Sequence, residues 1–122
     1  MSRILIADPN KDTRSALNLL ISHKLEFAST DIVEVDDVES LIRALSDSSF
    51  ELLLLDVQLY GAPALETCNL LQKAYPELKI ILLSVDTENG TTAKSAGVAF
   101  VHKGTSPGSV IKLLKTLLKN DQ

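Results

Sequence analysis

Four side chains with complementary chemistry follow short apolar runs in this sequence. Two are carboxylates, one is a hydroxyl and one is an ammonium group: Asp8, Asp56, Ser84 and Lys103. The apolar runs have the composition of strands, and open parallel sheets gather their functional groups beyond the carboxyl ends of the strands. We therefore expect these four side chains to meet in one shallow pocket at one edge of a sheet.

The elements that must position these groups alternate between two hydrophobic patterns. Short apolar runs predict strands over residues 4–7, 32–35, 52–55, 80–83 and 98–101. Apolar residues three or four apart predict helices over residues 12–23, 38–46, 64–74 and 107–119. Residues 87–96 have almost no apolar stripe, and we expect a short, frayed helix there. Such alternation indicates a parallel sheet with helices on both faces. Glu34 lies within the run 32–35 and Asp31 directly precedes it, which is typical of an edge strand.

Composition excludes several classes of protein. The 122 residues suit one domain, 1–122, and 45% hydrophobic with 23% charged residues is ordinary for a globular chain. Twelve basic and 16 acidic residues give a net charge of −4, which disfavours non-specific nucleic-acid binding. Cys68 is the single cysteine, so an internal disulfide is excluded, and no Cys/His cluster has zinc spacing. No apolar run approaches the roughly 20 residues of a membrane span, and the start lacks a signal-peptide pattern, so we expect a cytoplasmic protein.

Four segments together carry a resemblance to a known family. They are residues 4–14 (ILIADPNKDTR), 52–59 (LLLLDVQL), 81–84 (ILLS) and 96–103 (AGVAFVHK). In order and approximate spacing they resemble the receiver (CheY-like) domain of two-component response regulators, along essentially the whole chain. The resemblance implies a flavodoxin-like (βα)5 fold, a doubly wound parallel sheet with strand order 2-1-3-4-5. It also implies signal transduction without enzymatic activity, beyond self-catalysed phosphoryl transfer to an aspartate of the chain.

The same resemblance implies a role for each strand-end group. Asp56 would be the phosphoacceptor, a nucleophile that forms an acyl phosphate. Lys103 would pair with this carboxylate and then with the phosphoryl group, which needs its charge neutralised. Ser84 would turn toward the phosphoryl oxygens. Phe100 would change rotamer as the space that Ser84 leaves becomes empty.

A magnesium site is also implied by the resemblance. Its ligands would be Asp56, the backbone carbonyl of Gln58, and Asp8 through a metal-bound water. The family has a second acid where this chain has Pro9, which supplies no carboxylate. Its loss weakens the expected Mg²⁺ site and also removes a repulsion of roughly 3 kcal/mol between carboxylates about 5 Å apart. Asp12 is a candidate surrogate ligand, although an aspartate at a helix start is more often a cap.

Further departures from the family pattern surround the expected switch. The loop after the phosphoacceptor has Tyr60, Pro63 and Ala64 where the family usually has proline, aspartate or serine, and glycine. The stretch from Ser84 to Lys103 is shorter than the family spacing, with the loss in the region of the fourth helix. We expect this part of the fold to be either mobile or reshaped.

Several other polar or reactive residues are assigned to structure. Asp36 and Asp37 precede the helix 38–46 and are expected to cap it and to interact with its dipole. Cys68 lies on the apolar stripe of the helix 64–74 and is expected in the core. His23, at a helix end, and His102, expected to face a neighbouring helix, are not expected to be catalytic.

Three functional hypotheses remain open from the sequence. In the first, a sensor histidine kinase or phosphotransfer protein phosphorylates Asp56, and the domain switches a downstream effector or output domain. In the second, a degenerate receiver is a protein-interaction module that needs no phosphorylation. The third, a flavin-binding protein of the same fold, is disfavoured because no Ser/Thr/Gly-rich loop follows the first strand.

The partners implied by the resemblance are proteins. Homodimerisation through the face made by the fourth helix, fifth strand and fifth helix is a hypothesis that the resemblance suggests. Neither membrane association nor direct nucleic-acid binding is expected of this domain, given its modest negative charge.

Overall fold

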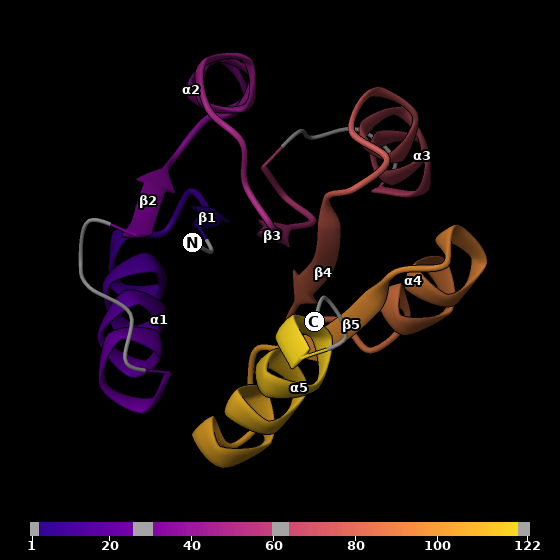
Figure 1. The fold of residues 1–122 in the computed structure, drawn as a ribbon. Coiled ribbons are helices and arrows are strands. Elements are labelled where there is room, and N and C mark those ends of the chain that lie inside the picture. The colour runs from indigo at the N-terminus through magenta and orange to yellow at the C-terminus, as the bar shows by residue number, and fades with distance from the viewer. Residues whose placement is uncertain (1–2, 26–30, 60–63, 120–122) are drawn as a thin grey trace.

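A single parallel sheet organises the protein. The computed structural model describes residues 3–25, 31–59 and 64–119. The five strands are β1 (Ile4–Ala7), β2 (Ile32–Val35), β3 (Leu52–Asp56), β4 (Lys79–Ser84) and β5 (Ala99–His102). They lie in the order β2-β1-β3-β4-β5, and all neighbouring pairs are parallel (Figure 1). This confirms the flavodoxin-like order 2-1-3-4-5, with β2 at an edge.

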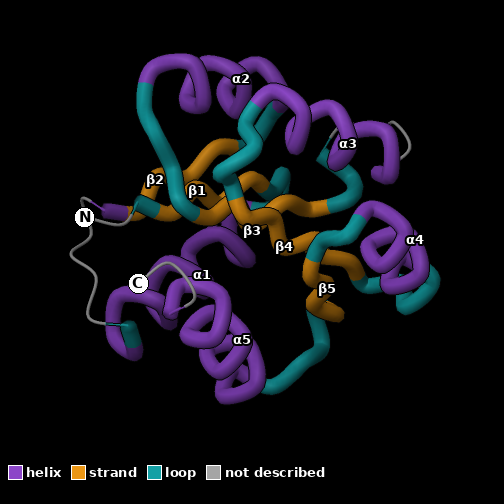
Figure 2. The backbone as a smooth tube through the Cα atoms, turned by 45° about the vertical axis from the view of Figure 1, so that its right-hand side comes forward, coloured by secondary structure: helices purple, strands orange, loops and turns teal. Residues whose placement is uncertain are grey.

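Helices cover both faces of the sheet. They are α1 (Lys11–Lys24), α2 (Val38–Asp47), α3 (Ala64–Ala74), α4 (Asn89–Ala96) and α5 (Pro107–Lys119). Figure 2 shows α1 and α5 on one side of the strands and α2, α3 and α4 on the other. Because all five strands are parallel, their carboxyl ends lie at the same edge of the sheet. The polar residues that follow the strands in the sequence must lie at this edge.

Two apolar cores result from the alternation of side chains along the strands. One core joins β1, β3, β4 and β5 to α1 and α5, and includes Ile6, Leu54 and Leu83. The other joins the sheet to α2, α3 and α4, and includes Leu55 and Leu82. Because β1 and β3 are buried on both faces, their sequences are continuous apolar runs rather than alternating ones.

Helix caps agree with the turn chemistry of the sequence. Asn10 caps α1 by accepting a hydrogen bond from the backbone N–H of Thr13 at 2.9 Å. Asp37 caps α2 by accepting one from Ser40 at 2.7 Å, which confirms the expected cap. The backbone hydrogen bond from Ser40 lowers the pKa of the Asp37 carboxyl. Cys68 is fully buried, as expected, and burial raises the pKa of its thiol.

Several boundaries differ by one or two residues from the predicted ones. The most informative is α4, which begins at Asn89 rather than at residue 87. The residues before it form turns, in which the N–H of Asn89 bonds the carbonyl of Asp86 at 3.2 Å. The helix ends at Ala96 and is capped by Gly97, whose φ of 73° is in the left-handed region that glycine adopts without strain. A short α4 fits the weak apolar pattern of this segment.

The other boundary shifts are at strands and at the ends of α1 and α2. β3 includes Asp56, β4 extends over residues 79–84, and β5 covers residues 99–102 instead of 98–101.

None of the helices in the described part of the chain has the length and hydrophobicity that a membrane crossing requires. Tyr60 and Pro63, in the rebuilt loop, lie outside the described residues.

Candidate functional site

Two carboxylates and one ammonium group meet at the carboxyl edge of the sheet. Asp8 follows β1, Asp56 ends β3 and Lys103 follows β5. The Lys103 Nζ lies 2.8 Å from Asp8 Oδ2 and also forms an ion pair with Asp56 Oδ2. The carboxylates are 0% and 3% exposed, whereas the lysine side chain is 21% exposed. Three of the four predicted groups are therefore in direct contact.

Each of the two carboxylates is held by a turn of the same kind in its own loop. The Oδ1 atom of Asp8 accepts a hydrogen bond from the backbone N–H of Asn10 at 2.8 Å. The Oδ1 atom of Asp56 likewise accepts one from Gln58 at 2.7 Å. Aspartate commonly bonds the N–H two residues later in such turns. Each carboxylate thus has one oxygen fixed by its own backbone, which leaves the other oxygen to face Lys103.

The protonation of Lys103 reflects two opposing influences. Burial lowers the pKa of its ammonium group, but hydrogen bonds and charge interactions with Asp56 and Asp8 outweigh burial and raise the pKa above 10.5. The lysine is therefore charged at neutral pH. It supplies the positive charge beside the two buried carboxylates.

This raised pKa predicts a loss of stability at alkaline pH. Because the folded-state pKa exceeds the unfolded one, the contribution of Lys103 to stability is complete below pH 10.5 and declines as the pH rises through the folded-state value. We expect the difference in unfolding free energy between the native chain and Lys103→Met to shrink above that pH. Urea unfolding of both proteins from pH 8 to about pH 11.5 measures it. A constant difference across this range would contradict the prediction.

Ser84 ends the neighbouring strand but has different contacts. Its side chain is buried, and its Oγ accepts hydrogen bonds from the backbone N–H of Asp86 and from Asn89 Nδ2, both at 2.9 Å. Among the described contacts, none joins this hydroxyl to Asp8 or Asp56. The expected meeting of four groups is therefore seen only in part. Asp8, Asp56 and Lys103 form a triad of charged groups in direct contact, whereas the Ser84 hydroxyl is bonded to the start of α4.

Strand alternation explains this division. Asp8, Asp56 and Lys103 follow the residue parity of the core under α1 and α5, whereas Ser84 follows the parity of the core under α3 and α4. Phe100 shares the parity of Ser84 and is half-buried against α4. Its ring packs at Gly90, where an added Cβ would lie 3.5 Å from the ring. The predicted switch residues are thus on one face and the charged groups on the other.

The residues present fit a family-type magnesium site poorly. The buried Asp8 Oδ2 has no hydrogen-bond partner and faces only the Lys103 ammonium, which is the one sign of a place for another cation. Pro9 is exposed and adds no carboxylate, and Asp12 is exposed. Within the described residues, no three His, Cys, Asp or Glu side chains form a group that could hold a metal ion. Lys103 already places one positive charge between the two acids.

Two contacts near the site were not expected from the sequence. Arg14 donates a hydrogen bond from Nη1 to the carbonyl of Asp8 at 2.8 Å and forms an ion pair with Glu34 at 3.4 Å. It thereby joins the turn after β1 to β2. His102 bonds the loop before α4 rather than facing the helix itself, with its Nε2 lying 2.8 Å from the carbonyl of Val85. Only the fold brings these partners together, so spacing in the sequence contained no signal for them.

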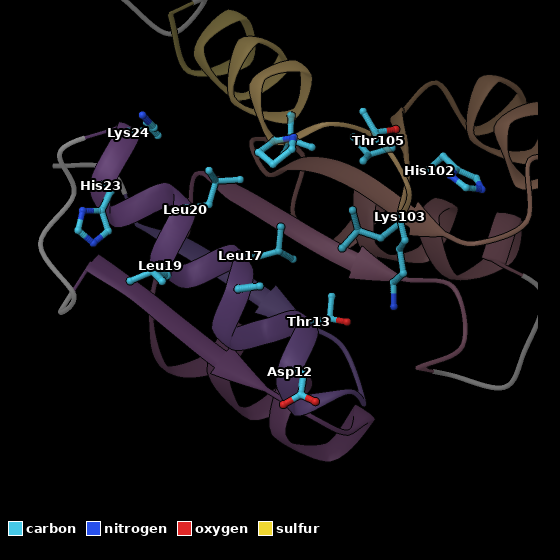
Figure 3. Close-up of a pocket in the computed structure, with 15 residues that line it drawn as sticks. Asp12, Thr13, Leu17, Leu19, Leu20, His23, Lys24, His102, Lys103 and Thr105 are labelled. Carbon is cyan, nitrogen blue, oxygen red and sulfur yellow. The ribbon is translucent and has the colours of Figure 1, made fainter.

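A cavity of about 680 Å³ lies beside the triad, between α1 and α5. Its walls are mainly apolar and include Leu17, Leu20 and Val110. Figure 3 shows Lys103 at its edge, with the side chains of Lys103 and His102 leaving the chain in different directions. Asp8 and Asp56 do not line this cavity. The charged site and the cavity are therefore adjacent and share Lys103, whereas the two carboxylates lie outside the cavity.

Sequence comparison finds one family and distant relatives. A family model described as the response regulator receiver domain matches residues 4–115. The response regulator UvrY of Escherichia coli (strain K12) is 24% identical over 121 residues, which cover 96% of this chain and 54% of that protein. The chain thus spans about half the length of the curated relatives that it matches.

Solved structures share the fold at low sequence identity. TrrA from Thermotoga maritima, solved in complex with Mg(2+)-BeF, has a TM-score of 0.81 and 23% identity, and the match covers 96% of this chain and 99% of that one. A CheY-like receiver domain protein from Methanospirillum hungatei JF-1 has a TM-score of 0.82 and 20% identity, with 98% and 95% coverage. At these identities the likeness concerns the fold.

Proposed function

Because the chain belongs to the response regulator receiver domain family of two-component systems, we propose that it accepts a phosphoryl group on Asp56. The donor would be a sensor histidine kinase or a phosphotransfer protein. The observation that carries this proposal is the buried Asp56 carboxylate, held by the N–H of Gln58 and paired with Lys103. The family match also favours this interpretation over a flavin-binding protein of the same fold.

The chemical step uses groups that are already in place. An oxygen of the Asp56 carboxylate attacks the phosphorus of the donor, and an O–P bond forms as the bond from phosphorus to the donor breaks. The products are an acyl phosphate on the chain and the free donor group. The transferred group carries negative charge on its peripheral oxygens, so catalysis consists mainly of positioning and charge neutralisation. Lys103 is the residue that provides this charge.

Magnesium has a smaller role in this proposal than the family pattern implies. A bound Mg²⁺ would supply further neutralisation of phosphoryl oxygens, held by Asp8, Asp56 and the carbonyl of Gln58. Pro9 removes one ligand, so we propose weak Mg²⁺ binding and a reaction that depends mainly on Lys103.

The response to phosphorylation would pass through Ser84 and Phe100. To reach a phosphoryl oxygen, the Ser84 hydroxyl must give up its hydrogen bonds to Asp86 and Asn89, and this moves the start of α4. Phe100, packed at Gly90, would then repack. A downstream effector or output domain would recognise the altered surface. The comparisons give no support to a phosphorylation-independent module.

The decisive experiment is phosphorylation of the purified chain by a small phosphodonor with Mg²⁺, followed by intact mass. We expect one phosphoryl adduct on the native chain and none on Asp56→Asn, because the amide removes the nucleophilic carboxylate. Asp47→Asn, which changes an exposed aspartate at the end of α2, is the matched control and should give the native yield.

Two results would count against phosphorylation at Asp56. An adduct that persists in Asp56→Asn would place the phosphoryl group elsewhere. No adduct on the native chain, even at high Mg²⁺, would favour a domain that binds its partner without phosphorylation.

A further inference from the structure

The imidazole of His102 bridges two loops at the edge of the candidate site. Its Nε2 lies 2.8 Å from the carbonyl oxygen of Val85, in the loop after β4. Its Nδ1 accepts a hydrogen bond from the backbone N–H of Gly104 at 2.9 Å, in the loop after β5. The residues adjacent to these partners are Ser84 and Lys103. One side chain therefore joins the loop of the hydroxyl to the loop of the ammonium group.

These contacts determine the tautomer of the ring. The Gly104 N–H can only donate, so Nδ1 must present its lone pair and carries no proton. The Val85 carbonyl can only accept, so Nε2 must carry the proton and donate it. His102 in this arrangement is the neutral imidazole protonated on Nε2, with both ring nitrogens hydrogen-bonded.

Glycine at position 104 permits this close approach. A Cβ added to Gly104 would lie 3.0 Å from His102 Nδ1 and 3.1 Å from Cε1, which is closer than ordinary contact distances. The backbone of Gly104 does not need glycine, because among the glycines of the described residues the positive φ is at Gly97. The added Cβ would therefore conflict with the imidazole ring and would not strain the backbone. An alanine at 104 is therefore acceptable to the backbone but not to the imidazole.

The same turn recurs at the other strand ends of the site. Asp8, Asp56 and Ser84 each accept a hydrogen bond from the backbone N–H two residues later, and His102 does so at the end of β5. His102 is also the register partner of Ser84 on the adjacent strand. The sheet ladder ends with the N–H of Lys103 bonded to the carbonyl of Ser84 at 2.8 Å. The His102 ring extends this connection one residue further into both loops.

We propose that His102 is a positioning residue that couples the loop of Ser84 to the loop of Lys103. It touches neither carboxylate of the triad and acts through its two backbone partners. The coupling ties the backbone of Val85 to that of Gly104, so that the two loops move together as a phosphoryl group arrives. This role rests on the proposed phosphorylation of Asp56, but the bridge itself can be measured without it.

The first experiment examines the bridge in the unphosphorylated chain. Long-range ¹H–¹⁵N spectra near neutral pH should show His102 as the neutral tautomer protonated on Nε2. In His102→Ala, the amide of Gly104 should exchange with solvent about fivefold faster, the effect of losing about 1 kcal/mol of hydrogen bonding. A tautomer protonated on Nδ1, or unchanged exchange at Gly104, would overturn the proposal.

The second experiment tests coupling by a double-variant cycle on the phosphorylation rate. His102→Ala and Gly104→Ala should each slow adduct formation about fivefold, the kinetic equivalent of about 1 kcal/mol. The double variant should be no slower than His102→Ala alone, because the added methyl group then meets no ring. Gly108→Ala, in α5 with nothing within 4 Å of its added Cβ, is the control and should react at the native rate.

Additive effects of the two substitutions would overturn the coupling, because Gly104→Ala would then act without the ring. If the native chain takes no phosphoryl group, the proposed function fails. The tautomer and the exchange rate of Gly104 then decide separately whether the bridge exists.

Discussion

Replacing Pro9 with aspartate is expected to increase Mg²⁺ affinity by about tenfold or more, because it adds a carboxylate to a site that now has two acids. The same change should destabilise the metal-free protein. A new carboxylate about 5 Å from Asp8 or Asp56 would be repelled by roughly 3 kcal/mol, an upper estimate since Lys103 offsets part of it. Mg²⁺ should reverse this loss by binding the folded state.

Pro9→Asn is the matched control, since it removes the proline and keeps the size of aspartate without its charge. Isothermal titration with Mg²⁺ and urea unfolding with and without Mg²⁺ measure the two effects. Pro9→Asp should be less stable than Pro9→Asn without the ion, and the difference should narrow or change sign with it. Equal Mg²⁺ affinity in the two variants would show that position 9 does not face the site.

Replacing Lys103 with methionine is expected to lower the free energy of unfolding by about 3 kcal/mol at neutral pH. Methionine keeps most of the volume but leaves two buried carboxylates without their cation. The largest part of this loss should come from Asp8 Oδ2, because this atom is fully buried and its ion pair with Lys103 is its contact with a donor group. The same variant should form the phosphoryl adduct far more slowly, since the group that neutralises the phosphoryl oxygens is gone.

Urea unfolding measures the stability of this variant, with Lys112→Met as the control. Lys112 is an exposed lysine on α5, so its replacement should change stability by less than about 0.5 kcal/mol. Adding Asp8→Asn to Lys103→Met should recover part of the loss, because the repulsion between the two carboxylates disappears. If Lys103→Met were as stable as the native chain, the triad would not contribute to folding.

Much of the fold was predictable because it depends on local chemistry. Continuous apolar runs identified β1 and β3, since strands buried on both faces need no polar alternation. The start of α2 directly after Asp37 followed from the capping preference of aspartate. The convergence of Asp8, Asp56 and Lys103 was also predictable, because parallel strands bring their carboxyl ends to one edge.

The contacts of those groups depended on the tertiary structure. Lys103 contacts both acids because its long side chain reaches from the end of β5, past β4, toward the ends of β3 and β1. The order of the strands in the sheet determines this contact, and residue spacing alone does not show it. Ser84 is bonded to Asn89, and His102 to Val85, because the fold places the start of α4 and the loop before it against the ends of β4 and β5. Hydrogen bonds between segments far apart in the chain depend on where backbone donors and acceptors come to lie. Residue type and periodicity specify which groups reach the edge of the sheet, while packing selects the partner that each one binds.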